Sequence, residues 1–196
     1  MKNEIGYFNP TVKVLTKTDR FLINMFDSGE FPFNNFLNSE ALKDMKNGDG
    51  VTYLIVNEKQ KGKQDLVAYY TISTGAINIV DRLDFDDNEM PEKEKKEHYL
   101  PISAFMIKMF AVNEKYQDCY FDNKLISSLI LKNIISELYD MSTSIIGAKR
   151  IILCSVPEAV NFYEKNEFEV LTNKYTILDK ADALDNTPMY LTLHDI

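Results

Sequence analysis

The stretch from residue 101 to residue 171 constrains the fold most, because it holds two apolar runs that are each followed by a helical pattern. Residues 101–112 form the first run, which is long enough for a strand buried on both faces. A helical pattern follows at residues 124–141, and residues 150–154 form the second run. Pro157 then suits the first position of another helix, where its missing N–H costs nothing. This order of elements predicts a parallel pair of strands joined by a right-handed crossover.

The helix predicted between the two strands has a defined buried face. Its apolar residues recur three and four positions apart, as expected for a helix that packs on a sheet. The spacing directs Leu129 and Ile130 toward the sheet and Lys132 and Glu137 toward solvent.

Further strand candidates lie on both sides of this stretch. Residues 51–56 and 66–73 are rich in β-branched and aromatic residues and are joined by a polar link, which predicts a hairpin. Shorter candidates are residues 12–15, 168–172 and 189–193. We therefore predict an α+β fold with a mixed, mostly antiparallel sheet of six or seven strands, one central parallel pair, and helices on both faces.

Length and composition limit the class of protein. A chain of 196 residues is expected to form one domain, residues 1–196. The net charge of −8 counts against a wide nucleic-acid surface, because such surfaces neutralise phosphates. Cys119 and Cys154 form no disulfide framework or metal pattern, so a reducing cytoplasm and no metal are expected. No signal peptide and no apolar run of about 18 residues is present, so no membrane association is expected.

A family resemblance is carried by two motifs: AVNEKYQ at the end of the first strand and AVNFYEKNEF in the last helix. With the order of elements, they resemble the GNAT superfamily of N-acetyltransferases. The resemblance is strongest to the branch of toxins that acetylate aminoacyl-tRNA and their bacterial relatives. It covers the chain from residue 51 to the terminal MYLTLHDI. It implies acetyl-CoA as the co-substrate and a primary amine as the acetyl acceptor.

The resemblance implies a pantetheine site at the end of the first strand. In the family this strand separates from its neighbour, and its free main-chain groups pair with pantetheine. The matching residues are Met109, Phe110, Ala111 and Val112. The alternative is an ordinary buried strand, because main-chain binding places little constraint on the sequence.

The phosphate-binding loop is where the sequence departs from the family. Gln117 stands in the expected place, but DCYFDNKLISS follows, without glycine and with about five residues more than the family loop. Close approach of backbone to phosphate is harder without glycine. Lys124, Ser127 and Ser128 are candidate substitute donors, and Asn123 is a candidate for a left-handed turn. The alternative is weak, rearranged or absent CoA binding.

The last helix supplies the candidate catalytic residue, Tyr163. The matching tyrosine of the family is the general acid that protonates the departing CoA thiolate. The alternative is aromatic packing beside Phe162. Asn161 is either a pantetheine contact or a surface residue. Glu167 stands where the family has glycine, and we expect Asn166 to take over part of the helix-ending role.

Three functions remain open. The leading hypothesis is an N-acetyltransferase that acts on a primary amine. The second is toxin-like acetylation of aminoacyl-tRNA. The resemblance to the toxin branch favours this function, and the net charge of −8 opposes it. The third is a non-catalytic GNAT-fold protein with a degraded CoA site. A homodimer or a protein partner is compatible with each, and the sequence singles out no general base or acceptor.

Overall fold

The structure, a computed structural model, describes residues 3–59, 63–81, 98–171, 175–177 and 186–194. The strands are β1 (Asn3–Glu4), β2 (Pro10–Val14), β3 (Val51–Glu58), β4 (Gln64–Asp81), β5 (His98–Val112), β6 (Cys119–Phe121), β7 (Lys124–Leu125), β8 (Arg150–Ser155), β9 (Glu169–Val170), β10 (Tyr175–Ile177) and β11 (Thr187–Thr192). The helices are η1 (Lys17–Asp19), α1 (Arg20–Asn24), α2 (Phe31–Asn35), η2 (Phe36–Glu40), α3 (Ala41–Asn47), α4 (Glu114–Gln117), α5 (Ile126–Ser144), η5 (Pro157–Ala159) and α6 (Val160–Glu164). None of these described helices is long and apolar enough to cross a membrane.

The main sheet has the strand order β2-β3-β4-β5-β8-β11-β9, and β10 pairs with β4. The pairs β2–β3, β3–β4, β8–β11 and β9–β11 are antiparallel. Strands β5 and β8, which α5 connects, are neighbours and form the parallel pair. The predicted α+β fold with a mostly antiparallel sheet is therefore confirmed. Every predicted strand is present, although β4 and β5 are longer than the sequence indicated.

The chain divides into two compact units. The first unit consists of residues 1–73 and 106–139, and the second consists of residues 74–105 and 140–196. Strands β4 and β5 and helix α5 contribute residues to both units. The expectation of one domain over residues 1–196 stays a prediction.

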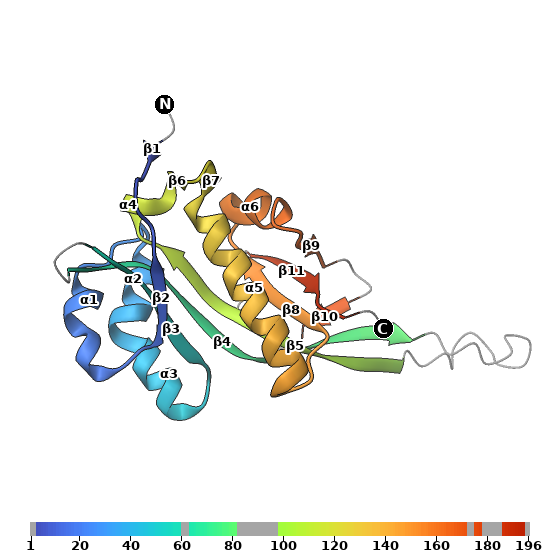
Figure 1. Cartoon of the computed structure of the whole chain (residues 1–196). Helices are drawn as coiled ribbons and strands as arrows, with labels where there is room; N and C mark the ends of the chain where they lie inside the picture. The colour runs from blue at the N-terminus through green and yellow to red at the C-terminus, as the bar shows by residue number, and fades with distance from the viewer. Residues whose placement is uncertain (1–2, 60–62, 82–97, 172–174, 178–185, 195–196) are drawn as a thin grey trace, which may run out of the picture. The chain divides into compact units, whose positions relative to one another are not determined.

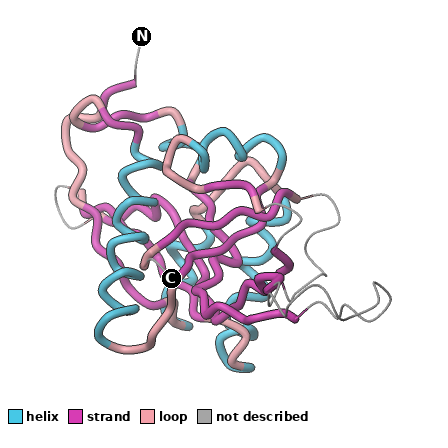
Figure 2. Tube along the Cα trace, turned by 90° about the vertical axis from the view of Figure 1, so that its right-hand side faces the viewer, coloured by secondary structure: helices cyan, strands magenta, loops and turns pink. Residues whose placement is uncertain are grey.

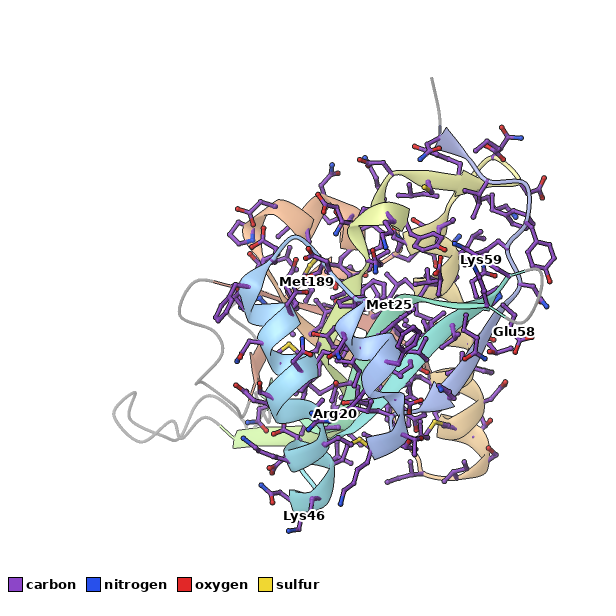
Figure 3. The ribbon with its side chains drawn as sticks, turned by 90° about the vertical axis from the view of Figure 1, so that its left-hand side faces the viewer. Arg20, Met25, Lys46, Glu58, Lys59 and Met189 are labelled. Atoms are coloured by element: carbon purple, nitrogen blue, oxygen red, sulfur yellow. The ribbon has the colours of Figure 1, made fainter. Side chains whose placement is uncertain are left out.

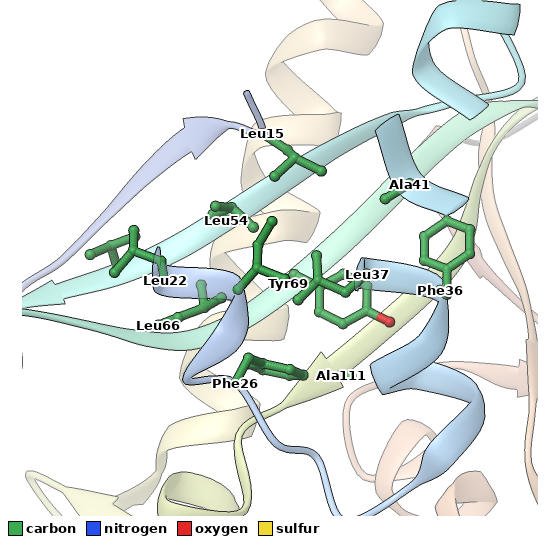
Figure 4. Packing of buried hydrophobic residues seen from close by; sticks show 12 residues of the cluster. Leu15, Leu22, Phe26, Phe36, Leu37, Ala41, Leu54, Leu66, Tyr69 and Ala111 are labelled. Carbon is green, nitrogen blue, oxygen red and sulfur yellow. The ribbon is translucent and has the colours of Figure 1, made fainter. Parts of the chain in front are cut away.

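The core of the first unit forms where α1, α2 and η2 pack on β3 and β4 (Figure 4). Tyr69 is fully buried there, and its ring lies 5.3 Å from that of Phe26 and 6.3 Å from that of Phe36. Its hydroxyl donates a hydrogen bond to the Phe33 carbonyl at 2.8 Å. The aromatic residues between α1 and η2 thus fix these helices on the sheet, although Phe31 is 78% exposed.

Helix α5 has the predicted amphipathic character with one difference in its buried face. Ile130, Ile134 and Leu138 are buried as the spacing predicts, and Lys132 and Glu137 are exposed. Leu129 is only half-buried, whereas Leu131 is fully buried. The most buried face of α5 thus includes Leu131, and Leu129, which the spacing directs toward the sheet, is less buried than Ile130.

The core of the second unit is built around the antiparallel pair β8–β11. Met189 pairs with Leu153, and both side chains are buried, as are those of Ile151 and Ile152. Met189, which is labelled in Figure 3, is fully buried. The apolar run that predicted β8 therefore reflects a strand buried on both faces.

Candidate functional site

The segment in place of the glycine-rich loop is a β-hairpin. Strands β6 and β7 pair antiparallel, with Phe121 opposite Lys124. The two residues between them, Asp122 and Asn123, have φ angles of +52° and +60°. A two-residue hairpin loop with positive φ at both positions is a type I′ turn, and Asp and Asn tolerate this conformation better than most residues. The left-handed conformation expected at Asn123 is confirmed, and Asp122 shares it.

A third strand completes this small sheet. Strand β1 pairs with β6 in parallel, with Asn3 opposite Cys119 and Glu4 opposite Tyr120. Figures 1 and 2 show the N-terminal strand beside the hairpin. The residues that exceed the length of the family loop are thus used to build an ordered three-stranded sheet, an arrangement that the sequence analysis did not predict.

Three candidate phosphate donors lie together where the hairpin leads into α5. Lys124 is exposed at the start of β7, Ser127 is buried, and Ser128 is half-buried. The first N–H groups of an α-helix have no partner within the helix and carry its positive end. Because α5 is 19 residues long, its first turn has the N–H groups and the polarity that favour a bound anion.

Gln117 does not offer its amide N–H groups to a ligand. Its Nε2 donates to the carbonyl of Ser28 at 2.9 Å and to that of Val112 at 3.0 Å. Both N–H groups of this amide are therefore used within the protein, and only its carbonyl oxygen remains as an acceptor. The side chain ties the loop after α1 to the end of β5, so the structure gives Gln117 a positioning role.

The candidate pantetheine strand ends in a well-paired region. Met109 and Phe110 are half-buried, and Ala111 and Val112 are buried. Just beyond them, the N–H of Asn113 donates to the carbonyl of Val67 in β4 at 2.7 Å. This bond anchors the end of β5 to β4. The role of the four residues in pantetheine binding stays a prediction.

Tyr163 is buried within an aromatic cluster in the second unit. It is 8% exposed, and its ring contacts those of Phe162 and Phe168 at centroid distances of 5.2 and 5.6 Å in edge-to-face geometry. Burial raises the pKa of the Tyr163 phenol far above its ordinary value. The hydroxyl therefore keeps its proton at neutral pH.

The Tyr163 hydroxyl differs from those of the other buried tyrosines. Tyr69, Tyr70 and Tyr116 donate hydrogen bonds of 2.8, 2.9 and 2.8 Å to the Phe33 carbonyl, the Glu137 carboxylate and the Asp65 carboxylate. Among the described residues, the Tyr163 hydroxyl has no hydrogen-bond partner. No fully buried polar side-chain atom of the described residues lacks a partner, so the oxygen of this hydroxyl keeps some accessible surface although the ring is buried. A hydroxyl of this kind can donate its proton to water or to a ligand.

The turn after α6 shows how the chain replaces the family's glycine. Glu167 has a φ angle of +73°, a conformation that is costly for a residue with a Cβ. Asn166 is buried, and its Nδ2 donates to the Phe162 carbonyl at 2.8 Å. Asn166 thus helps to end the helix as expected, but the left-handed residue is Glu167. Asn161 is exposed on the same helix.

A surface groove of about 930 Å³ lies elsewhere in the first unit. It is lined by Ile5, Gly6, Tyr7, residues 57–59, Lys63 and Tyr116. Figure 3 labels Glu58 and Lys59 of this groove at the end of β3. None of the predicted site residues lines it. Among the described residues, no group of three or more His, Cys, Asp or Glu side chains could hold a metal ion.

Comparison by sequence gives no match, either to a known protein family or to a curated protein. Comparison by structure gives matches over nearly the whole chain. A tyrosine-to-phenylalanine mutant of the AtaT toxin is 15% identical, with a TM-score of 0.68, over 95% of this chain and 94% of that chain. The same mutant bound to the C-terminus of the antitoxin AtaR and acetyl-CoA is 13% identical, with a TM-score of 0.64, over 94% and 93%. AtaT complexed with acetyl-methionyl-tRNAfMet is 16% identical, with a TM-score of 0.61, over 92% and 94%.

These similarities agree with the element order and with the parallel pair β5–β8. The identities are too low to carry an activity from one protein to another, but the coverage of both chains is nearly complete. The chain therefore has the same fold as the AtaT toxin, which is the GNAT fold.

Proposed function

We propose that this protein is an N-acetyltransferase that moves the acetyl group of acetyl-CoA to a primary amine. The observation that carries the proposal is the hydroxyl of the buried residue Tyr163, which keeps its proton and has no hydrogen-bond partner among the described residues. The GNAT fold supports the choice of acetyl-CoA as the acyl donor. A similar structure, the AtaT mutant bound to acetyl-CoA and the C-terminus of AtaR, supports it as well.

The chemistry that this hydroxyl supports is protonation of a leaving group. The acceptor nitrogen attacks the thioester carbonyl carbon, and the resulting tetrahedral intermediate collapses with cleavage of the C–S bond. Tyr163 donates its proton to the departing sulfur. A buried phenol is a weak acid, but burial also raises the pKa of a thiol in the same surroundings, so the proton can move to sulfur. The acceptor nitrogen loses its proton to water, and the Tyr163 phenolate regains a proton from water before the next turnover.

Several residues are candidates for holding acetyl-CoA. Main-chain groups of Met109, Phe110, Ala111 and Val112 would pair with pantetheine. The first turn of α5 with Ser127 and Ser128, and Lys124 before it, would bind the pyrophosphate. Gln117 would act by holding the end of β5, because its amide N–H groups are already used.

The finer proposal is that the acceptor is the amino group of an aminoacyl-tRNA. The similar structure of AtaT with acetyl-methionyl-tRNAfMet favours this acceptor. The net charge of −8 opposes it, because RNA binding depends on neutralising phosphates. A protein partner is also part of this proposal, because a similar structure is AtaT bound to the C-terminus of the antitoxin AtaR. We further propose a single catalytic domain that works in the cytoplasm.

Acetyl-CoA binding and acetyl transfer test the proposal directly. Calorimetry with acetyl-CoA should give saturable binding, and mixing the protein with labelled acetyl-CoA and aminoacyl-tRNA should transfer label to the amino group. Transfer to simple primary amines but not to aminoacyl-tRNA would retain the acetyltransferase and reject the toxin-like acceptor. Absence of acetyl-CoA binding would favour a non-catalytic protein with a degraded CoA site.

A further inference from the structure

The N-terminal segment, residues 3–8, is attached to the hairpin β6–β7 by main-chain and side-chain contacts. Its strand β1 pairs with β6, and the N–H of Ile5 donates to the Tyr120 carbonyl at 2.9 Å. The amide Nδ2 of Asn3 lies 3.1 Å from the Sγ of Cys119, a residue 116 positions away in the sequence. The contact is therefore a tertiary one that joins the start of the chain to the middle.

The same segment also contacts the turn of the hairpin. The Oε1 of Glu4 accepts a hydrogen bond from the backbone N–H of Asn123 at 3.2 Å. The rings of Phe8 and Phe121 lie 5.9 Å apart. Because Asn123 has a left-handed conformation, a bond to its N–H helps to hold the turn in that shape.

The hairpin depends on this support. It has only two residue pairs, Tyr120 with Leu125 and Phe121 with Lys124. A short two-stranded hairpin is marginally stable in water, and a third strand is needed for independent stability. Strand β1 supplies that third strand, and the hairpin leads directly into the first residue of α5, Ile126.

We infer that Glu4 and Ile5 are positioning residues for the acetyl-CoA site, because they hold the hairpin that sets Lys124 and the first turn of α5. The inference rests on the proposed function and adds to it: the N-terminal segment replaces the glycine-rich loop as the device that shapes the pyrophosphate end of the site. It acts on cofactor affinity and leaves the chemical step at Tyr163 unchanged.

The main experiment compares Ile5→Pro with Ile5→Ala in the full-length chain. Proline removes the N–H that bonds to the Tyr120 carbonyl, whereas alanine keeps it. With acetyl-CoA as donor, Ile5→Pro should raise KM roughly 3- to 10-fold. This change corresponds to the free energy of one lost hydrogen bond together with a less ordered hairpin. Its kcat should stay near that of wild type, and Ile5→Ala should show a smaller rise in KM.

A second donor separates positioning of the pyrophosphate end from general damage. S-acetylpantetheine carries the thioester but lacks the nucleotide and its pyrophosphate. Its kcat/KM should be the same for wild type and Ile5→Pro. An equal loss with both donors, or a fall in thermal midpoint that parallels the loss of binding, would overturn the inference in favour of a purely structural role.

The side chain of Glu4 gives an independent check that does not introduce proline. Glu4→Ala should weaken acetyl-CoA binding in calorimetry, and Glu4→Gln should restore it, because the amide oxygen can still accept from the Asn123 N–H. Wild-type binding with no change in the Glu4 and Ile5 variants would overturn the inference and leave the proposed function intact. Failure of the wild-type chain to bind acetyl-CoA would overturn both.

Discussion

The hairpin β6–β7 and the turn after α6 both stand where the resembled family uses glycine. They differ in which residues adopt the left-handed backbone conformation in place of glycine. The hairpin places Asp122 and Asn123 in the left-handed region, and these residue types visit it readily. The turn after α6 places Glu167 there, although glutamate has no short polar side chain to support that conformation. The first region has thus changed its structure to suit other residues, whereas the second keeps the family's turn at a cost in strain.

The two regions also differ in how their polar groups are used. Near the hairpin, the Gln117 amide and the Asn123 N–H are both bonded within the protein. In the α6 region, the ring of Tyr163 is buried, and its hydroxyl has no hydrogen-bond partner among the described residues. Internal hydrogen bonds stabilise the first region, whereas the second contains a hydroxyl without a partner among the described residues. Under the proposed function, the hairpin region would set cofactor binding and the α6 region would carry the chemical step.

The sharpest test of this division is Tyr163→Phe. The variant keeps the ring packing on Phe162 and Phe168 but loses the proton. Turnover should fall by roughly 10²- to 10⁴-fold, the usual contribution of general acid catalysis. The thermal midpoint and the affinity for acetyl-CoA should barely change, because no hydrogen bond within the described protein is lost.

Tyr116→Phe is the matched control for this test, because its hydroxyl donates to Asp65 at 2.8 Å. It should lower the free energy of unfolding by about 1 kcal/mol and leave kcat unchanged. A Tyr163→Phe variant that loses stability and keeps turnover would reverse the roles assigned to the two hydroxyls.

The second test uses alkaline pH. Burial raises the pKa of Tyr163 above the value of about 10 expected in the unfolded chain. Above that pH the unfolded chain releases this proton while the folded chain keeps it, so the stability contribution present below pH 10 is lost as pH rises. Wild type should therefore lose up to about 1.4 kcal/mol more per pH unit than Tyr163→Phe in that range. Denaturant unfolding of both proteins at several pH values measures the difference, and parallel curves would contradict the assigned burial.

The third test asks whether the bonds near the hairpin are structural. Gln117→Ala removes both bonds of the amide and should lower the free energy of unfolding by about 1–2 kcal/mol. Asp118→Ala changes an exposed neighbour and should stay within about 0.5 kcal/mol of wild type. Chemical denaturation compares the two. Equal, small effects would show that Gln117 is available to bind ligand.

The smallest expected effect concerns the left-handed residues themselves. Glu167→Gly should raise the free energy of unfolding by about 0.5–1 kcal/mol, because relief of strain exceeds the entropy that glycine adds to the unfolded chain. Asn123→Gly should change it by no more than about 0.3 kcal/mol, because asparagine is already tolerated there. A larger gain at Asn123 than at Glu167 would break the comparison between the two turns.

The amino-acid sequence alone determined the main elements of the fold. The sequence predicted strands β3, β4, β5 and β8 and helix α5. They could be predicted because burial makes apolar residues recur with the period of a strand or a helix. The family resemblance also pointed to Tyr163 and to the missing glycines. Asp122 and Asn123 carried a turn signal between two short strands, but the hairpin was missed because the expected glycine is absent.

Only the tertiary structure decided how these elements are used. Strand β1 pairs with residues more than a hundred positions away, and no local pattern specifies such a contact. Leu131 is fully buried and Leu129 only half-buried, and this difference depends on how α5 lies on the sheet. The amide N–H groups of Gln117 are bonded, whereas the Tyr163 hydroxyl has no partner among the residues that the structure describes, and this difference depends on which groups surround each side chain. The periodicity of burial is a local property of the amino-acid sequence, whereas hydrogen-bond partners are residues distant in sequence that only folding brings together.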